Sequence, residues 1–139
     1  MEIFSDNPNN FPLHIIDPII RQMNELLKLD LDTINMHYLS DNEVLSININ
    51  YLNHDYYTDI ITFDLRDEFS QEAEIYISLE RIKENALKYK VTDEEELARI
   101  CIHGLLHLSG IGDKTEKDKK IMTQLEKKYL TELFHVKPK

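Results

Sequence analysis

Three side chains in the last third of the sequence have the types and the spacing of a metal site. His103 and His107 are four residues apart in a segment predicted to be helical, so their rings lie on one face, one turn apart. Two imidazoles in this arrangement can bind a divalent ion at about 2.0–2.1 Å each. Asp113 follows and offers a carboxylate oxygen as a third ligand. We therefore predict that His103, His107 and Asp113 bind one metal ion, zinc or another divalent metal.

The glycines of this segment indicate how Asp113 can return to the two histidines. All three glycines of the chain, Gly104, Gly110 and Gly112, fall between residues 103 and 113. Gly110 can adopt the left-handed conformation that ends a helix sharply, and Gly112 provides a second permissive position. Two histidines and one carboxylate leave a coordination position for water, which is typical of a catalytic rather than a structural zinc site.

The segment also has the spacing of the metzincin signature, with two differences. In the pattern H-x-x-x-H-x-x-G-x-x-D, Gly104 replaces the glutamate that serves metzincin proteases as a general base, and Asp113 replaces their third histidine. The missing base disfavours peptide hydrolysis. The remaining pattern still predicts a metzincin-like metal-binding helix-turn. A pair of histidines at this spacing also occurs as ordinary structural residues, so the glycines and Asp113 are what favour a metal.

Predicted helices and strands must hold this segment in place. Asp17 and Pro18 have the types of an N-cap and a first helical residue, and Ser78, Thr92 and Thr115 can cap three later helices. The apolar patterns predict four strands, at Ile34–Leu39, Val44–Tyr51, Asp59–Asp64 and Ala73–Leu79. Residues 40–43 suit a hairpin-type connection. We expect one α+β domain over residues 1–139, mostly a small four-stranded mixed sheet with helices packed on it.

Composition excludes several classes of protein. The 139 residues are 42% hydrophobic and 30% charged, which suits a packed core and a hydrated surface. No apolar run approaches the ~18–20 residues of a membrane span, and the acidic, polar start is unlike a secretory signal. Cys101 is the single cysteine, which fits a reducing compartment. We expect a cytoplasmic protein with no membrane partner.

The net charge of −10 is unevenly distributed along the chain. Between Lys114 and Lys139 there are eight basic residues against four acids, whereas the other 113 residues hold eight basic residues against 22 acids. Such a lysine run is most often a solvated helix face. The basic end is nevertheless compatible with a polyanionic partner such as a nucleic acid, although the acidic remainder of the chain does not favour one.

Three stretches of sequence occur in the order and spacing of one known family. Residues 103–110 match H-G-x-L-H-L-x-G, and residues 58–63 match T-D-V/I-L/I-S/T-F. Residues 74–82 match a strand with an acid and an isoleucine that leads into an E/D-R-V/I helix start. With these motifs in register from Val44 to Asp113, the chain resembles the YbeY family of bacterial rRNA-maturation endoribonucleases.

The resemblance implies a metal-dependent endoribonuclease that cuts single-stranded RNA, uses zinc and needs no nucleotide cofactor. It implies a role in maturation of the 3′ end of small-subunit rRNA and in ribosome assembly and quality control, with RNA and the ribosome or a ribosomal protein as partners. The family usually has a third histidine where Asp113 stands and an arginine where Leu52 stands. Loss of the arginine's donors to phosphate is a substantive change. His54, two residues further on, is the candidate catalytic residue, as a cation or proton donor; the alternative is a loop histidine without a role.

Other functions stay open at the level of the sequence. The chain could be a non-catalytic ribosome-assembly factor whose metal only stabilises the turn after the helix, which the departure at Leu52 favours. A metzincin-like peptidase is a further, less favoured alternative. Tyr51, Tyr56 and Tyr57 could stack on RNA bases or simply pack at the end of a strand.

Overall fold

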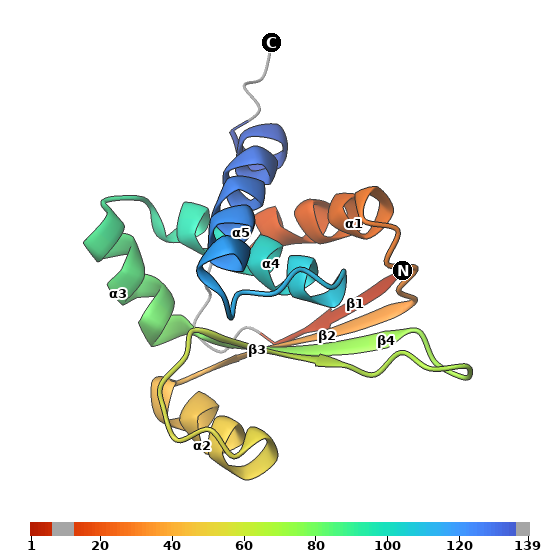
Figure 1. Ribbon diagram of the computed structural model, residues 1–139, viewed down its shortest axis with the longest axis horizontal. Helices are drawn as coiled ribbons and strands as arrows, with labels where there is room; N and C mark the ends of the chain where they lie inside the picture. The colour runs from red at the N-terminus through yellow and green to blue at the C-terminus, as the bar shows by residue number, and fades with distance from the viewer. Residues whose placement is uncertain (7–12, 136–139) are drawn as a thin grey trace.

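A mixed β-sheet forms the base on which the other elements are arranged. Figure 1 shows the computed structural model, which describes residues 1–6 and 13–135. Within these residues the sheet has four strands in the order β1 (Glu2–Ser5), β2 (Thr33–Leu39), β4 (Glu72–Ser78) and β3 (Ile60–Asp64). The pairs β1–β2 and β2–β4 are parallel, and β3 runs antiparallel to β4. The predicted α+β class with a four-stranded mixed sheet is confirmed.

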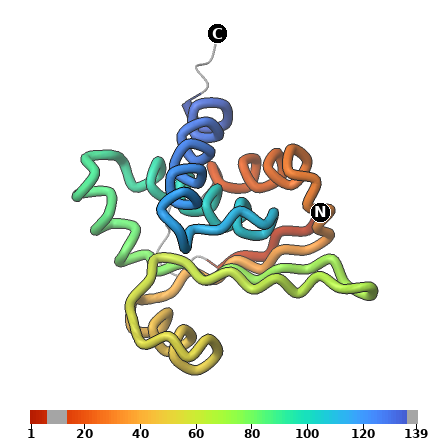
Figure 2. The backbone as a smooth tube through the Cα atoms, in the orientation of Figure 1, coloured from red at the N-terminus to blue at the C-terminus, as the bar shows by residue number. Residues whose placement is uncertain are grey.

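Helices lie on both faces of this sheet (Figures 1 and 2). Four of them lie on the side drawn uppermost in Figure 1: α1 (Ile16–Leu26), α3 (Leu79–Tyr89), α4 (Asp93–Leu108) and α5 (Glu116–Tyr129). The helix α2 (Asp41–Leu52) lies on the opposite face and contacts β3 and β4. A 3-10 turn, η1 (Leu13–Ile15), precedes α1, and a π-helical turn, η2 (Leu130–Phe134), follows α5.

The core lies between the sheet and α1 and α4. Alternate residues of β2 and β4 are buried on this side, as expected for strands with one covered face, and they include Ile34, Met36, Ile75 and Ile77. The inner side of α4 is buried against them at helical spacing: Leu97, Ile100, Cys101, Leu105 and Leu108. The core therefore fixes which face of α4 remains for His103 and His107.

The prediction of a strand at Val44–Tyr51 is wrong, because these residues belong to α2. Ser40 and Glu43 form a reciprocal capping box that starts the helix: Glu43 N–H donates to the Ser40 hydroxyl at 3.2 Å, and Ser40 N–H donates to the Glu43 carboxylate at 3.1 Å. Residues 40–43 are thus a helix start rather than a hairpin connection. Burial of Val44 and Asn48, four residues apart, follows the helical period rather than the alternation of a strand.

The N-terminal part of the chain differs from the prediction in two ways. Asp17 does not cap α1, since the helix begins at Ile16 directly after η1 and Asp17 lies in its first turn. The fourth strand is β1, at the edge of the sheet, and its mostly exposed residues have no alternating pattern that would reveal it. As a result, α1 and α2 both lie between strands in the sequence.

The strands and caps that matter for the site are where the sequence placed them. The strands predicted at Ile34–Leu39, Asp59–Asp64 and Ala73–Leu79 correspond to β2, β3 and β4. The side chains of Ser78, Thr92 and Thr115 accept N-terminal hydrogen bonds of α3, α4 and α5. None of the helices in residues 1–6 and 13–135 has the length and apolarity to cross a bilayer. Lys137 and Lys139 of the basic end lie outside the described residues.

Gly104 allows α4 to approach the sheet closely. A Cβ atom at this position would lie 2.8 Å from Ile60 Cδ1 and 3.2 Å from Thr62 Oγ1, both on β3. Both distances are shorter than ordinary contacts of about 3.5–4.0 Å, so even an alanine there would require the side chains of Ile60 and Thr62 to shift. The absence of a side chain therefore lets α4 pack directly on these side chains of β3, next to His103.

The helix α4 ends in a Schellman motif at Gly110. Gly110 has φ +99°, its N–H donates to the His107 carbonyl at 3.0 Å, and the Ile111 N–H donates to the Leu106 carbonyl at 3.0 Å. The left-handed turn predicted for Gly110 is confirmed. Gly112 does not have a positive φ, so the second permissive position is not used as such. The turn directs the chain back toward the face of α4 that carries the histidines.

The positive φ of Gly110 predicts that Gly110→Val will distort the turn and destabilise the fold. A β-branched residue at this φ should lower the free energy of unfolding by about 1–3 kcal/mol, because it resists the left-handed region. Denaturant unfolding measures this loss. Gly112→Ala is the matched control, since its Cβ would meet Asp118 Oδ2 at an ordinary 3.4 Å. Equal stability of Gly110→Val and Gly112→Ala would contradict the assigned turn.

Candidate metal centre

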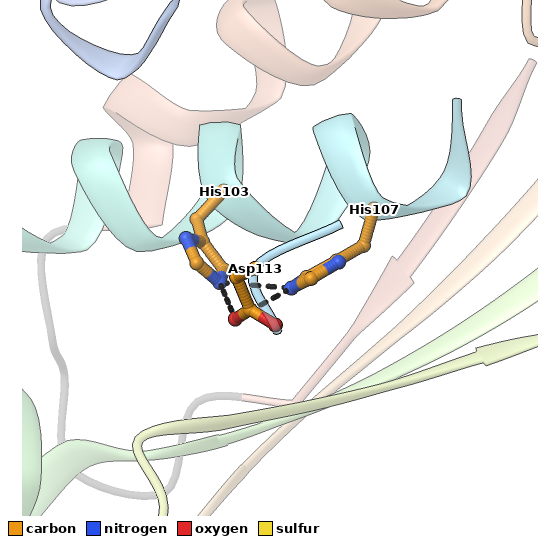
Figure 3. A group of neighbouring side chains, drawn as sticks. All are labelled: His103, His107 and Asp113. Carbon is orange, nitrogen blue, oxygen red and sulfur yellow. Dashed lines mark hydrogen bonds and ion pairs between the residues drawn. The ribbon is translucent and has the colours of Figure 1, made fainter. Parts of the chain in front are cut away.

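The structure brings His103, His107 and Asp113 together, as the sequence predicted. His103 Nε2 and His107 Nε2 lie 3.0 Å apart, and Asp113 Oδ2 lies 3.6 Å from the first and 3.3 Å from the second. Figure 3 shows both rings extending from α4 toward the carboxylate, which the following loop supplies. Three ligand atoms on one side of a helix end thus point into a common space.

The separations fit a divalent metal. Ligands at about 2.0–2.1 Å from a tetrahedral ion lie about 3.3 Å from one another, and the three distances average close to that value. Two imidazole nitrogens and a carboxylate oxygen are also a donor set that suits such an ion. The group could therefore hold one metal ion and leave a coordination position open.

Glu126 orients the first histidine from α5. The Nδ1–H of His103 donates to Glu126 Oε2 at 2.6 Å, which leaves Nε2 of a neutral His103 with its lone pair directed at the group. Carboxylates commonly hold metal-binding histidines in this way and fix the ring nitrogen that is free to bind. Glu126 is only 7% exposed, so this hydrogen bond is protected from water.

A buried charge network supports Glu126. Arg99 donates to Glu126 Oε1 at 3.1 Å and makes two hydrogen bonds, at 2.6 and 2.8 Å, to the carboxylate of Glu96. Burial raises the pKa of Glu126, but the hydrogen bonds and charges of His103 and Arg99 outweigh burial and hold that pKa below its ordinary value. Glu126 therefore remains a carboxylate and accepts, rather than donates, the hydrogen bond to His103.

The three candidate ligands line an open cleft of about 590 Å³ between α4 and β3. The end of α2, the loop after it and β3 supply the rest of the lining: Asn48, Leu52, His54, Tyr56, Thr58, Asp59, Ile60, Ile61 and Thr62. Lys114, next to Asp113, also lines the cleft. A substrate in this cleft would contact the candidate metal group directly.

His54 lies in this cleft, as its candidate role requires. Its ring stacks on Tyr56, with the centroids 5.3 Å apart, and its Nδ1 is 3.1 Å from the Tyr56 hydroxyl. Asn48 donates from Nδ2 to the Tyr56 carbonyl at 2.9 Å and so ties the loop to α2. Leu52 also lines the cleft, which places the missing arginine of the family pattern at this site.

Asp59 is a partly buried carboxyl group that lines the cleft. Burial raises the pKa of Asp59 and outweighs the lowering by the charges of Arg99 and His103. Arg99 lies 3.8 Å from Asp59 Oδ2, so this carboxyl group joins the network that holds Glu126. Asp59 thus binds a proton more readily than an exposed aspartate does.

Sequence reasoning missed Glu126 and Arg99. Glu126 acts on the site from α5, far from His103 in sequence, whereas Arg99 lies one turn before His103 on α4 and acts on it through Glu126. A signal for Glu126 nevertheless exists, because it shares the inner face of α5 with Met122 and Tyr129 at helical spacing. An acid on an otherwise apolar face needs a buried partner.

Removal of Glu126 should weaken metal binding without removing a ligand. We expect Glu126→Ala to lower zinc affinity about 10- to 100-fold, because the ring of His103 loses its orienting acceptor. Glu126→Gln should lose less, since its amide oxygen can still accept from Nδ1–H. Competition titration with a zinc indicator measures the affinities, and Glu116→Ala, on the exposed side of the same helix, is the control. Affinity of Glu126→Ala equal to that of the control would contradict this role.

Comparison with known proteins shows the family of the chain. A family model described as Endoribonuclease YbeY matches residues 8–134. Proteins named Endoribonuclease YbeY are 50% identical in Flavobacterium psychrophilum, over 75% of this chain and 74% of that one, and 40% identical in Karelsulcia muelleri, over 81% and 77%. The solution structure of a Thermotoga maritima protein superposes with a TM-score of 0.64 at 28% identity, over 97% of this chain and 90% of that one. The chain belongs to the YbeY family.

Proposed function

We propose that this chain is a zinc-dependent endoribonuclease that cuts single-stranded RNA during the maturation of ribosomal RNA. The relatives that carry the name Endoribonuclease YbeY support the reaction class. The observation that carries the proposal is the convergence of His103, His107 and Asp113 in an open cleft, with ligand separations that suit a tetrahedral ion.

In this proposal the residues of the chain bind the ion and orient the RNA. His103 and His107 supply nitrogen ligands, Asp113 supplies an oxygen ligand, and Glu126 holds the first ring in place. When bound, zinc supplies Lewis-acid chemistry, which acidifies a water molecule and withdraws charge from a phosphoryl oxygen. The open side of the group faces the cleft, so the phosphodiester can approach it there.

Lys114 and His54 are the groups that we propose for contact with the RNA. Lys114 is the only lysine or arginine among the described residues that line the cleft, and it adjoins Asp113. Its ammonium can bind the phosphate that the arginine of the family pattern would otherwise contact. His54 can donate or accept a proton, and its ring with Tyr56 can stack on an unpaired base.

The structure opposes the peptidase alternative. A protease of the metzincin type needs a glutamate next to the first histidine. Gly104 occupies that position, and even a Cβ there would lie 2.8 Å from Ile60 Cδ1. The position that would carry this general base therefore has no side chain and packs directly on β3.

The proposed partners and location follow from the proposed substrate. An enzyme that matures ribosomal RNA meets the ribosome or a ribosomal protein, and the acidic body of the chain suits a basic ribosomal protein. It would act in the cytoplasm, which agrees with the free, buried thiol of Cys101. The non-catalytic assembly factor would have the same partners, so only activity separates the two functions.

Asp113→Ala tests the proposed reaction. We expect the variant to fold, because Asp113 lies in a loop, and to lose both bound zinc and cleavage of single-stranded RNA. Metal analysis, circular dichroism and a gel assay measure these properties on one preparation. Glu68→Ala, an exposed loop carboxylate away from the cleft, should behave as wild type. A folded, zinc-free Asp113→Ala that still cuts RNA would refute the proposal, and normal rRNA maturation in cells carrying it would favour the assembly factor.

His54→Ala tests the candidate catalytic histidine. A general acid or base contributes about 10²- to 10⁴-fold, so kcat should fall by that factor while KM changes little. Tyr56→Phe is the control, since it keeps the stacked ring and removes only the hydroxyl near Nδ1. A rise in KM with unchanged kcat would show instead that His54 only binds the RNA by stacking on a nucleobase.

A further inference from the structure

The solvent face of α5 carries a concentration of positive charge. Lysines at five positions of the helix are exposed: Lys117, Lys119, Lys120, Lys127 and Lys128. Helical geometry places Lys117, Lys120 and Lys127 on one side, opposite the buried Met122 and Tyr129. Among the described residues, none of these three lysines forms an ion pair, whereas Lys119 lies 3.8 Å from Glu116.

The acids of α5 do not neutralise this face. Glu126 is buried and bound to His103 and Arg99. Asp118 turns toward the loop before the helix, where its carboxylate lies 3.4 Å from the Cβ position of Gly112. Glu116 is the one α5 acid that remains on the outward side with the lysines.

The basic face begins at the metal group. Lys114 lines the cleft beside Asp113, Thr115 caps α5, and the helix starts at the next residue. From Lys117 to Lys127 the helix rises about 15 Å. That length corresponds to about four nucleotides of a stacked strand at its ~3.4 Å rise.

Helix stability gives no reason for lysine at the start of α5. Lys117 lies in the first turn, where the helix dipole favours anions over cations. The side chains point away from the core and so contribute no packing. Meanwhile residues 1–113 hold 22 acids against eight basic residues, so the lysines of α5 offer a polyanion a basic surface on an otherwise acidic chain.

We propose that the lysine face of α5, defined as Lys114, Lys117, Lys120 and Lys127, binds the sugar-phosphate backbone of the RNA where the strand leaves the cleft. The inference rests on the proposed function, because it takes single-stranded RNA as the substrate. It adds the direction of the strand: from the metal group along the outer side of α5. Contacts of this kind bind phosphates without reading sequence.

The double variant Lys117→Gln/Lys120→Gln tests the lysine face. The Asp113→Ala protein is the parent, and the double variant also carries Asp113→Ala, so that a fluorescent single-stranded RNA oligonucleotide stays intact. Fluorescence anisotropy gives the Kd of each protein between 50 and 200 mM salt. Each lost phosphate contact lowers the slope of log K against log salt by about 0.7, so we expect a slope smaller by about 1.4. The affinity difference from the parent should then shrink about sevenfold over this salt range. Thermal unfolding checks that the double variant is folded.

Lys83→Gln/Lys88→Gln is the matched control, because it removes two exposed charges from the outer side of α3. It should keep the slope of the parent. An equal loss of slope in the control, or a parent-like slope in the Lys117→Gln/Lys120→Gln protein, would overturn the lysine face. RNA cleavage by the wild-type chain would in that case still uphold the proposed function. Absence of both RNA binding and wild-type cleavage would overturn the two proposals together.

Discussion

The sharp end of α4 is the constraint on which the candidate site depends. If the helix continued past Ser109, residue 113 would lie about 9 Å further along the axis than His107, beyond reach of a shared ion. The Schellman motif at Gly110 instead returns the chain, and Asp113 Oδ2 comes within 3.6 Å of both ring nitrogens. One residue in the left-handed conformation therefore adds Asp113 to the two helix histidines as a third candidate ligand.

Two neighbours hold the helix in the position that this turn requires. On one side Gly104 lets α4 pack directly against Ile60 and Thr62 of β3. On the other side Glu126 reaches from α5 and fixes the ring of His103, with Arg99 holding Glu126 in turn. The site is thus built where a sheet, a helix end and a second helix meet, and each contributes a different restraint.

The sequence revealed those parts of the site that are encoded locally. The two histidines, the helix-ending glycine and Asp113 lie within eleven residues, and their spacing alone predicted the group. Val44–Tyr51 misled because its apolar alternation resembled a strand, whereas the capping box before it determined a helix. The pairing of Glu126 with His103 and Arg99 could not be predicted, since it is set by how α4 and α5 pack rather than by residues near in sequence.

The short span of the ligand set has a consequence for how the ion affects folding. Residues so near in sequence meet without closing a long loop, so the unfolded chain keeps some capacity to chelate. Binding to both states cancels part of the stabilisation that an ion confers on the native one. The hydrogen bond from Glu126 that orients the ring of His103 exists only where α5 is packed on α4, so it favours binding of the ion to the native state over the unfolded one.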